Sequence, residues 1–436
     1  MSLSVLSGLI ILVLLVIMLI AGVPIAVALG ISSVCAILPV MDLNVAVVTG
    51  AQRIFSGISV FSLLAIPFFI LAGNIMNKGG IAIRLINLAK IVTGRTPGGL
   101  AQTNILANAL FGAISGSGTA AASAMGSIIG PIEKDEGYDP NFSAAANIAT
   151  APTGLLIPPS NVMITFSLVS GGTSVAALFM AGYIPGALWA LACMLGVYIY
   201  AKKAGYRSQT KLTGKEKINA FIQALPCLLL IVIVIGGIIA GVFTATEGSV
   251  VAVVYSLLLS IYGYKSMKWK DLPEIFRSSA EMTGIIIFLI GVSSIMSWVM
   301  AFTNIPTMVS NGLLSISSNK YVILLMINII LLVVGTFKDM TPATLIFTPI
   351  FLPVCTALGM NTIHFGIMLI FNLCIGTITP PVGTTLFVGV KVGGVKIETV
   401  FKHLLPYFFA IIVVLMLVTY IPQLSLWLPG LMGYVS

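Results

Sequence analysis

Long apolar stretches alternate with short polar segments along the whole chain, and this pattern predicts two consecutive sets of membrane-spanning helices. For the first set we expect spans at 3–22, 24–40, 60–77 and 173–201, with a surface helix at 43–57. For the second set we expect spans at 223–243, 246–262, 282–301 and 403–425, with a surface helix at 265–279. The polar segment 202–222 would link the two sets on the cytoplasmic side.

Each set also contains an apolar region that is interrupted by a short polar turn. In the first set, two short helices within 98–132 flank Ser115-Gly116-Ser117-Gly118-Thr119. In the second set, two short helices within 320–354 flank the segment from Thr336 to Thr341. Half-length helices joined in this way predict a re-entrant hairpin, which enters and leaves the membrane by one face.

A broken span follows each hairpin. The span at 142–169 is interrupted between Gly154 and Asn161, and the span at 361–390 is interrupted just after Gly376. Both interruptions contain a Pro-Pro pair, and proline has no backbone N–H to continue a helix. We therefore expect free backbone carbonyls at both breaks.

The two sets match each other when the sequence is shifted by 222 residues. This shift places Thr119 on Thr341, Gly154 on Gly376 and Pro158-Pro159 on Pro380-Pro381, and eleven of the 54 pairs from 119 to 172 are identical. Broken helices at matching positions of a duplicated unit are typical of secondary transporters. The sequence predicts an all-α polytopic membrane protein, built as an inverted repeat of two five-span units, 1–201 and 223–436.

Charge placement supports the inversion. If the linker is cytoplasmic, every Lys and Arg except Arg53, Lys320 and Lys338 lies on the cytoplasmic side, as the positive-inside rule requires. Counting the hairpins as full spans would place the basic stretch from Lys78 to Arg95 outside the cell. We interpret that stretch as an interfacial helix whose basic residues meet lipid headgroups.

Composition narrows the class of protein further. Only 8% of the residues are charged and 58% are hydrophobic, whereas a soluble domain carries about 25% charged residues. The net charge of +9 lies at the ends of spans, so it orients the protein and does not indicate a nucleic-acid partner. The scattered cysteines, two isolated histidines and absence of Walker A or HExxH patterns predict neither a transition-metal site nor an enzyme. We expect the acidic residues from Glu133 to Asp139 to lie in a solvated cytoplasmic loop.

Hydroxyl and carbonyl oxygens are the ligands that a hard cation such as Na⁺ prefers. For a first Na⁺ site we expect Ser115, Ser117 and Thr119, with backbone near Gly154. The alternative is that this turn of small residues only allows close helix packing. Recurrence of the same design 222 residues later favours the ion site.

For a second Na⁺ site we expect Thr336, Asp339 and Thr341, with backbone near Gly376. Asp339 is the only acidic residue predicted at membrane depth, where a charge needs a partner. Two alternatives stay open, because Asp339 could pair with Lys338 or the turn could lie in a solvated vestibule. Lys338 could also attract an anionic solute.

Four further polar residues fall between the two predicted ion sites. Ser160, Asn161, Thr377 and Thr379 are candidates for hydrogen bonds to an oxygen-rich substrate. Equally, these side chains could only satisfy the carbonyls that the prolines free. The sequence does not choose between the two roles.

Three stretches at the breaks resemble a known family. Gly112–Ala120 (GAISGSGTA), Ile157–Ser160 (IPPS) and Gly376–Gly383 (GTITPPVG) resemble the large membrane subunit, of the DctM/SiaM type, of tripartite ATP-independent periplasmic (TRAP) transporters. The resemblance covers essentially the whole chain. It implies an elevator-type fold, similar to that of divalent anion/Na⁺ symporters, in which hairpins and broken spans form a transport domain that moves against a scaffold.

The resemblance also implies Na⁺-driven import of an acidic solute across the bacterial inner membrane. The implied partners are a soluble periplasmic substrate-binding protein and a small four-span membrane subunit, which we expect to be a separate chain. The substrates of the family are mostly carboxylates, including C4-dicarboxylates and sialic acid, and the overall impression favours the sialic acid branch. An anion carried alone would oppose the membrane potential by about 2.3 kcal/mol per 100 mV, so we expect at least two Na⁺ per cycle.

Three alternative functions follow from the same pattern. The first is a free-standing Na⁺/anion symporter that needs no binding protein. The second is a channel or membrane scaffold subunit, but a channel should show a continuous polar stripe along several spans, and the polar residues here concentrate at the breaks. The third is a proton-coupled carrier, which would normally place more than one carboxylate or histidine within the membrane.

Overall fold

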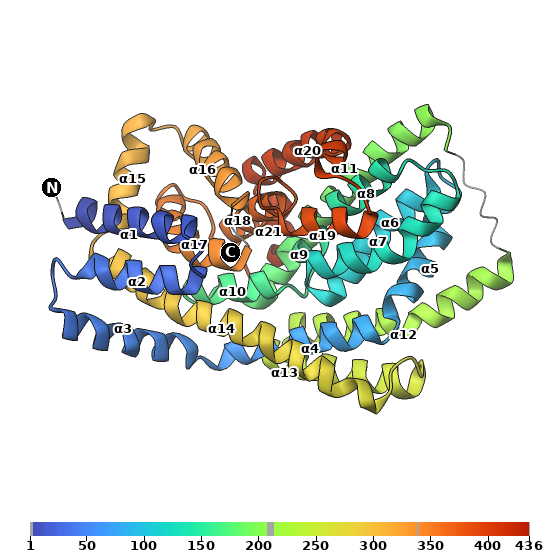
Figure 1. Cartoon of the computed structure of the whole chain (residues 1–436), viewed down its shortest axis with the longest axis horizontal. Coiled ribbons are helices and arrows are strands. Elements are labelled where there is room, and N and C mark those ends of the chain that lie inside the picture. The colour runs from blue at the N-terminus through green and yellow to red at the C-terminus, as the bar shows by residue number, and fades with distance from the viewer. Residues whose placement is uncertain (1–2, 207–212, 338–339, 436) are drawn as a thin grey trace.

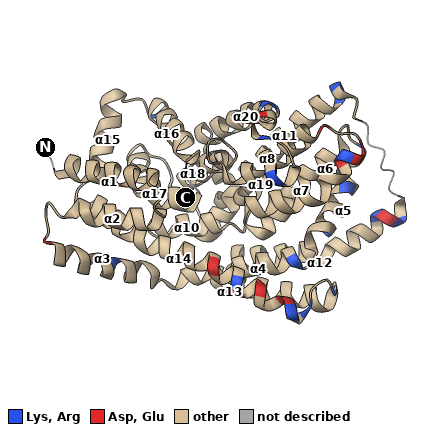
Figure 2. Ribbon diagram, in the orientation of Figure 1, with Lys and Arg blue, Asp and Glu red and all other residues tan. Residues whose placement is uncertain are grey.

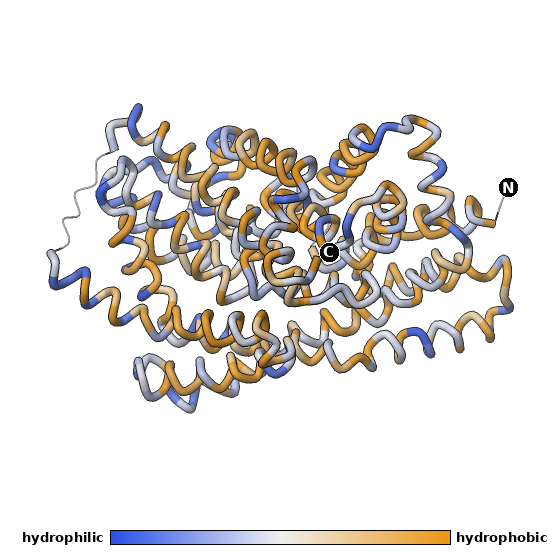
Figure 3. The backbone as a smooth tube through the Cα atoms, turned by 180° about the vertical axis from the view of Figure 1, so that it is seen from behind, coloured by the Kyte–Doolittle hydropathy of each residue, from blue (hydrophilic) through white to orange (hydrophobic). Residues whose placement is uncertain are grey.

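A computed structural model describes residues 3–206, 213–337 and 340–435. The predicted ion ligand Asp339 and its neighbour Lys338 lie outside the described residues. Among the described residues, eight helices are long and apolar enough to cross a membrane, or up to ten when each of two bent helix pairs is counted as one span. The predicted all-helical polytopic fold is therefore confirmed, and apolar residues dominate most of these helices (Figure 3).

The first half of the chain contains twelve helical elements within its described part. They are α1 (Leu3–Ile20), α2 (Ile25–Ile37), α3 (Leu43–Ile58), η1 (Phe61–Leu64), α4 (Ala65–Lys78), α5 (Ile81–Thr93), α6 (Gly99–Ser115), α7 (Gly118–Asp135), α8 (Pro140–Thr150), α9 (Thr153–Leu156), α10 (Asn161–Val169) and α11 (Val175–Ala204). The predicted first hairpin corresponds to α6 and α7, and the first broken span to α8, α9 and α10. The two parts of this broken span meet at an angle of 47°.

The second half repeats much of this order. Its elements are α12 (Gly214–Ile239), α13 (Ala245–Leu258), η2 (Leu259–Gly263), η3 (Trp269–Asp271), α14 (Leu272–Phe302), α15 (Ile305–Ile316), α16 (Lys320–Gly335), α17 (Met340–Ala357), α18 (Thr362–Thr377), α19 (Thr384–Gly393), α20 (Ile397–Tyr420) and α21 (Gln423–Leu431). The second hairpin corresponds to α16 and α17, and the second broken span to α18 and α19. The assignment of the halves to two inverted five-span units stays a prediction.

Some helices differ from the sequence-based expectation. The surface helix expected at 265–279 and the span at 282–301 form one helix, α14, because its only proline, Pro273, lies in the first turn, where proline is tolerated. Helix α12 begins within the expected linker, since Thr213 and Glu216 form a capping box that stabilises an early start. We did not expect α15, which bends by 120° into α16, or α21.

The helices form two layers (Figure 1). One layer contains α2, α3, α4, α13 and α14, in which α14 packs against α2, α3 and α4, and α4 packs against α13. The other layer contains the hairpins and broken spans, in which α6 contacts α9, α16 contacts α18 and α7 contacts α19. Contacts of α4 with α6, and of α14 with α17, join the layers.

Charged residues are unevenly distributed over the fold. They gather around the ends of α5, α11, α12 and α13, and they are rare around α1, α2 and α15 (Figure 2). This one-sided distribution agrees with the orientation predicted from the positive-inside rule.

Candidate functional site

The turn of the first hairpin brings its three predicted hydroxyl residues together. Helix α6 ends at Ser115, and Gly116 takes a left-handed conformation (φ +60°) that lets the chain reverse. The Ser117 hydroxyl caps α7 by accepting a hydrogen bond from the Ala120 N–H, and it lies 3.1 Å from the Thr119 hydroxyl. The Ser115 hydroxyl lies 3.5 Å from the Ser117 carbonyl oxygen.

Gly112 and Gly154 are the points where this hairpin touches its broken span. A Cβ atom on Gly154 would clash with the backbone of Gly112, and the reverse also holds. Both residues are buried, Gly112 on α6 and Gly154 on α9. At this pair the small residues allow close helix packing, which brings the non-helical backbone after α9 next to the hairpin turn.

The second hairpin makes the corresponding contact with its own broken span. A Cβ atom on Gly376 would clash with the backbone of Gly335 at the end of α16. The Thr336 carbonyl oxygen accepts a hydrogen bond of 3.2 Å from the Val382 N–H, and the Thr336 hydroxyl donates to the Val333 carbonyl oxygen. Thr341 is half-buried in the first turn of α17.

A cavity of about 420 Å³ lies between the two hairpin turns. It is bounded by both turns, both broken spans, α2 and α14. Among the predicted site residues, those that line it are Ser117, Thr119, Asn161, Thr341 and Thr377. None of the described lining residues is charged, and the volume falls in the range of small-molecule sites, about 300–1,000 Å³.

The four predicted substrate residues divide into two pairs. The Thr377 and Thr379 hydroxyls donate to the carbonyl oxygens of Cys374 and Ile375, so they satisfy backbone of their own helix. Ser160 Oγ and Asn161 Oδ1 are buried, and neither has a hydrogen-bond partner among the described residues. A buried polar atom without a partner is costly, which makes this pair the better candidate for a ligand.

Sequence reasoning missed two hydroxyl residues of this cavity, Thr384 and Thr385. They begin α19, and a Cβ atom on Gly118 would lie 3.3 Å from Thr385 Oγ1. The start of α7 therefore faces the start of α19, so the first hairpin lies against the second broken span. Their position directly after the GTITPPVG stretch is the signal that could have found them.

Buried asparagines, also missed, join each hairpin to its broken span. Asn108 Nδ2 on α6 donates to Asn147 Oδ1 on α8 at 3.0 Å. Asn372 Nδ2 on α18 donates to Asn328 Oδ1 on α16 at 2.6 Å. Polar side chains that bond across helices hold membrane helices together, so these bonds join each hairpin to its own broken span.

A second cavity, of about 710 Å³, lies further along α14, at the end that we predict to face outward. The described side chains around it are mostly hydroxyls and apolar groups, and Arg53 is the one charged residue among them. The Arg53 guanidinium lies 5.2 Å from the centre of the Trp298 ring. The two cavities are neighbours, because Leu289 lines the central one and Ile290 lines this one.

The family model of the tripartite ATP-independent periplasmic transporter, DctM component, matches residues 12–424. The chain belongs to this family. A C4-dicarboxylate TRAP transporter large permease protein of Rhodobacter capsulatus is 36% identical over 98% of this chain and 100% of its own. A sialic acid TRAP transporter large permease protein of Vibrio cholerae is 37% identical over 88% of this chain and 90% of its own. An uncharacterized protein of Salmonella typhimurium, YgiK, is 53% identical over 95% of each chain.

The fold of this TRAP permease is also that of a solved transporter. The crystal structure of Alcanivorax borkumensis YdaH aligns over 100% of both chains with a TM-score of 0.67, at 13% identity. This permease is therefore a multi-pass protein of the bacterial inner membrane, and it is a transporter subunit rather than an enzyme. Family membership implies a small membrane subunit and a periplasmic binding protein as partners.

Proposed function

We propose that this permease imports a small carboxylate solute together with at least two Na⁺ ions, by an elevator movement of the hairpin layer against the α14 layer. The single observation that carries the proposal is the central cavity, where both hairpin turns and both broken spans meet α14. The cavity lies at the boundary between the layers. A sliding movement of one layer would therefore carry a bound solute with it.

The oxygens at the first turn fit Na⁺ as a transported ion. Ser117 and Thr119 offer hydroxyl oxygens, and the buried Asn161 Oδ1 has no partner among the described residues. A Cβ atom on Gly116 would lie 3.2 Å from the Pro159 carbonyl oxygen, which places a backbone acceptor at the same turn. Oxygen ligands without sulfur or imidazole suit a hard cation. A second ion at Thr336, Asp339, Thr341 and Gly376 remains part of the proposal.

Two classes of carboxylate are the candidate substrates. The relatives described above are named for C4-dicarboxylates and for sialic acid. We propose sialic acid as the first substrate to test, with a C4-dicarboxylate as the alternative. The outer cavity favours an anion of either class, since Arg53 is the charged side chain that lines it.

The proposed complex contains a separate small four-span subunit and a soluble periplasmic binding protein. The second candidate function is a free-standing Na⁺/anion symporter, which the same cavity would serve. Uptake into liposomes that contain the permease alone, compared with uptake by the complete system, distinguishes the two.

The test is uptake of labelled sialic acid and labelled C4-dicarboxylate into proteoliposomes that contain the permease, the small subunit and the binding protein. We expect uptake of one solute only when Na⁺ is high outside. Asn161→Ala and Thr341→Ala should each lower the initial rate about tenfold or more, because each removes an oxygen from the central cavity. A tenfold loss of uptake rate corresponds to a loss of about 1.4 kcal/mol in binding free energy, which is the scale of one lost hydrogen bond to a charged group.

Ser315→Ala is the matched control, since Ser315 is an exposed helix serine whose hydroxyl bonds only the Gly312 carbonyl oxygen of its own helix. Its uptake rate should equal that of the wild type. Uptake that does not respond to the Na⁺ gradient would overturn Na⁺ coupling. Undiminished uptake by both cavity variants would overturn the site.

A further inference from the structure

Glu133 is buried, although the sequence placed it in a solvated loop. It lies in the last turn of α7 and its exposed fraction is 0%, whereas its neighbours Lys134 and Asp135 are exposed. The side chain borders a cavity of about 480 Å³ that Asn104, Ser143 and Asn147 also line. Helices α6 and α8 pack against α7, which explains the burial.

Neither carboxylate oxygen of Glu133 has a hydrogen-bond partner among the described residues, and no ion pair is formed by Glu133 in that part of the chain. The Ser143 hydroxyl is likewise buried without a partner there. An ionised carboxylate in such surroundings is strongly disfavoured, because burial removes its hydration and no cation replaces it. The neutral acid avoids this cost.

The occupant that this geometry accommodates is a proton. Both Glu133 oxygens are buried, and no group of three or more His, Cys, Asp or Glu side chains that could hold a metal ion is found among the described residues. A proton needs no additional space. Burial raises the pKa of Glu133 to about 8, the nearby Ser143 hydroxyl opposes this rise and the charge of Glu136 adds to it.

We propose that Glu133 is a proton-binding site at the predicted cytoplasmic end of the hairpin layer, occupied while α7 and α8 are packed together. When these helix ends separate, water from the adjacent cavity reaches the side chain. The acid O–H bond then breaks, the proton passes to that water, and the carboxylate remains. Proton occupancy would therefore favour the packed conformation, independently of which solute is carried.

One basic residue, Lys134, lines the same cavity as Glu133, but its side chain is exposed and forms no ion pair with Glu133. The other titratable groups near Glu133 are Glu136 after the end of α7, Tyr138 in the following loop and Tyr407 on α20, and these three supply no positive charge. Tyr138 and Tyr407 both have buried hydroxyls without a partner among the described residues. The surroundings therefore favour the neutral acid.

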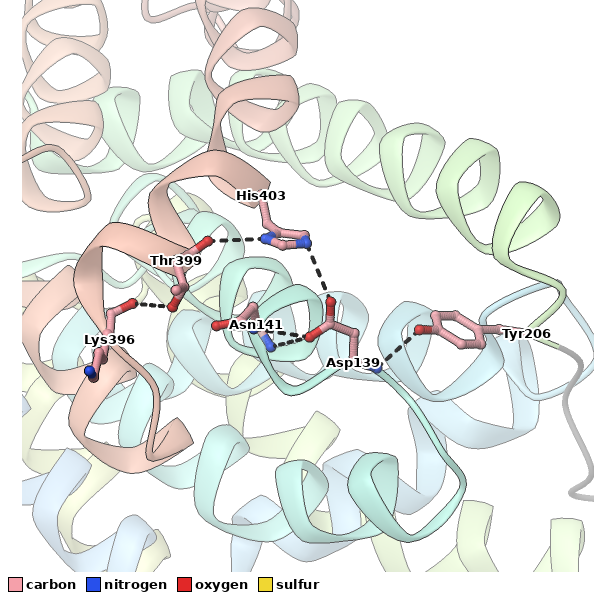
Figure 4. Close-up of polar contacts among 6 residues, drawn as sticks. All are labelled: Asp139, Asn141, Tyr206, Lys396, Thr399 and His403. Atoms are coloured by element: carbon pink, nitrogen blue, oxygen red, sulfur yellow. Dashed lines mark hydrogen bonds and ion pairs between the residues drawn. The ribbon is translucent and has the colours of Figure 1, made fainter.

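The loop that leads from α7 to α8 is held in place by two other elements (Figure 4). Asp139 Oδ2 lies 3.4 Å from His403 Nε2 on α20, and the Asp139 N–H donates to the Tyr206 hydroxyl after α11. His403 Nδ1 lies 3.1 Å from the Thr399 carbonyl oxygen, so both ring nitrogens face oxygen atoms. These contacts fix the start of α8 against α20 and against the segment after α11.

Infrared spectroscopy of the purified permease tests the proposal directly, because a protonated carboxyl group has its own C=O stretching band. The spectrum is recorded from about pH 5 to about pH 9. We expect a band that persists at neutral pH and disappears near pH 8 in the wild type. Glu133→Gln, which resembles the protonated acid in size and hydrogen bonding, should lack the carboxyl band that disappears near pH 8.

Glu136→Gln is the matched control, since it removes the neighbouring carboxylate and leaves Glu133 in place; its band should persist at neutral pH. Disappearance of all carboxyl bands within the ordinary glutamate range in the wild type would overturn the proposal. So would a neutral-pH band that survives in Glu133→Gln. Neither outcome bears on Na⁺-driven uptake, so a failure here is distinct from a failure of the proposed function.

Thermal unfolding supplies a second measurement. Between the ordinary glutamate pKa and about 8, the native state holds one proton more than the unfolded state, so stability falls as pH rises. One such proton changes the unfolding constant about tenfold per pH unit. The melting temperature of Glu133→Gln should fall less over this window than that of the wild type. Identical pH profiles of the two proteins would contradict the proposal.

Discussion

At the scale of single residues, two glycine pairs decide how closely the hairpins approach the broken spans. Gly112 meets Gly154, and Gly335 meets Gly376, in both cases backbone against backbone. Gly154 and Gly376 also match each other when the sequence is shifted by 222 residues, so both halves have a glycine at the position where the broken span meets its hairpin. A side chain at any of these positions would push the turn away from the break.

Gly154→Ala should therefore destabilise the permease. The added methyl group clashes with Gly112, and overpacking of this kind typically costs about 1–3 kcal/mol. The measurement is the melting temperature in detergent, together with the uptake rate. Gly130→Ala on α7 is the control, because no atom lies within 4 Å of its added Cβ; it should be at least as stable as the wild type, since alanine favours a helix more than glycine does. Equal melting temperatures of the two variants would contradict the close-approach argument.

At the scale of elements, the start of α8 depends on Asp139. Its carboxylate caps the helix by accepting from the Asn141 N–H at 2.9 Å, and the same side chain pairs with His403 (Figure 4). The proline that follows suits the first helical position. One residue therefore begins the broken span and joins it to α20.

Asp139→Ala and Asp139→Asn separate these two roles. Alanine removes both the cap and the contact with His403, and loss of an N-cap costs about 1 kcal/mol. Asparagine is as good a cap as aspartate, so it should lose only the partly exposed pair, which is worth less. We expect the melting temperature to fall in the order wild type, Asp139→Asn, Asp139→Ala. Asp135→Ala, which changes an exposed residue, is the control and should melt at the wild-type temperature. The reverse order of melting temperatures would contradict the two roles assigned to Asp139.

At the scale of the whole molecule, the central cavity lies where the two layers meet. Its lining residues come from segments as distant in the sequence as α2 and α19, so a ligand bound there would join parts of the chain that are far apart in sequence. Binding to the folded state alone raises its stability by about 2.7 kcal/mol at a ligand concentration one hundred times Kd. A Na⁺ site in this cavity should therefore be visible without any transport assay.

Na⁺ should raise the melting temperature of the purified permease, whereas the same concentration of K⁺ or choline should not. Ser117→Ala removes a hydroxyl oxygen from the first turn and should reduce the shift. The Ser315→Ala variant should retain it in full. A shift that is equal for Na⁺ and K⁺ would indicate a general salt effect and contradict a Na⁺ site.

Much of the fold could be predicted because helix content and helix breaks are local properties. The hairpin turn at Gly116 and the broken span after Gly154 occur where glycine and proline predict them. The sequence did not predict that α14 is uninterrupted or that α12 begins so early. The pattern of apolar residues shows which stretch of a helix can be buried, but it does not show at which residue the helix begins or ends. For the site, Ser117 and Thr119 were predicted as ligands of one Na⁺ site and Thr341 as a ligand of another. The structure places all three around one cavity, and their role as ion ligands stays a prediction.

The sequence by itself determined the membrane environment, the order of most helices and the positions of the hairpin turns and broken spans, since these follow from the hydrophobicity and backbone preferences of neighbouring residues. Only the tertiary structure decided which polar groups are left without partners. Thr377 and Thr379 are satisfied by their own helix, whereas Asn161 Oδ1 and the Glu133 carboxylate have no partner among the described residues. Burial and pairing depend on helices that are distant in the chain, and a local pattern carries no information about which of these will pack together.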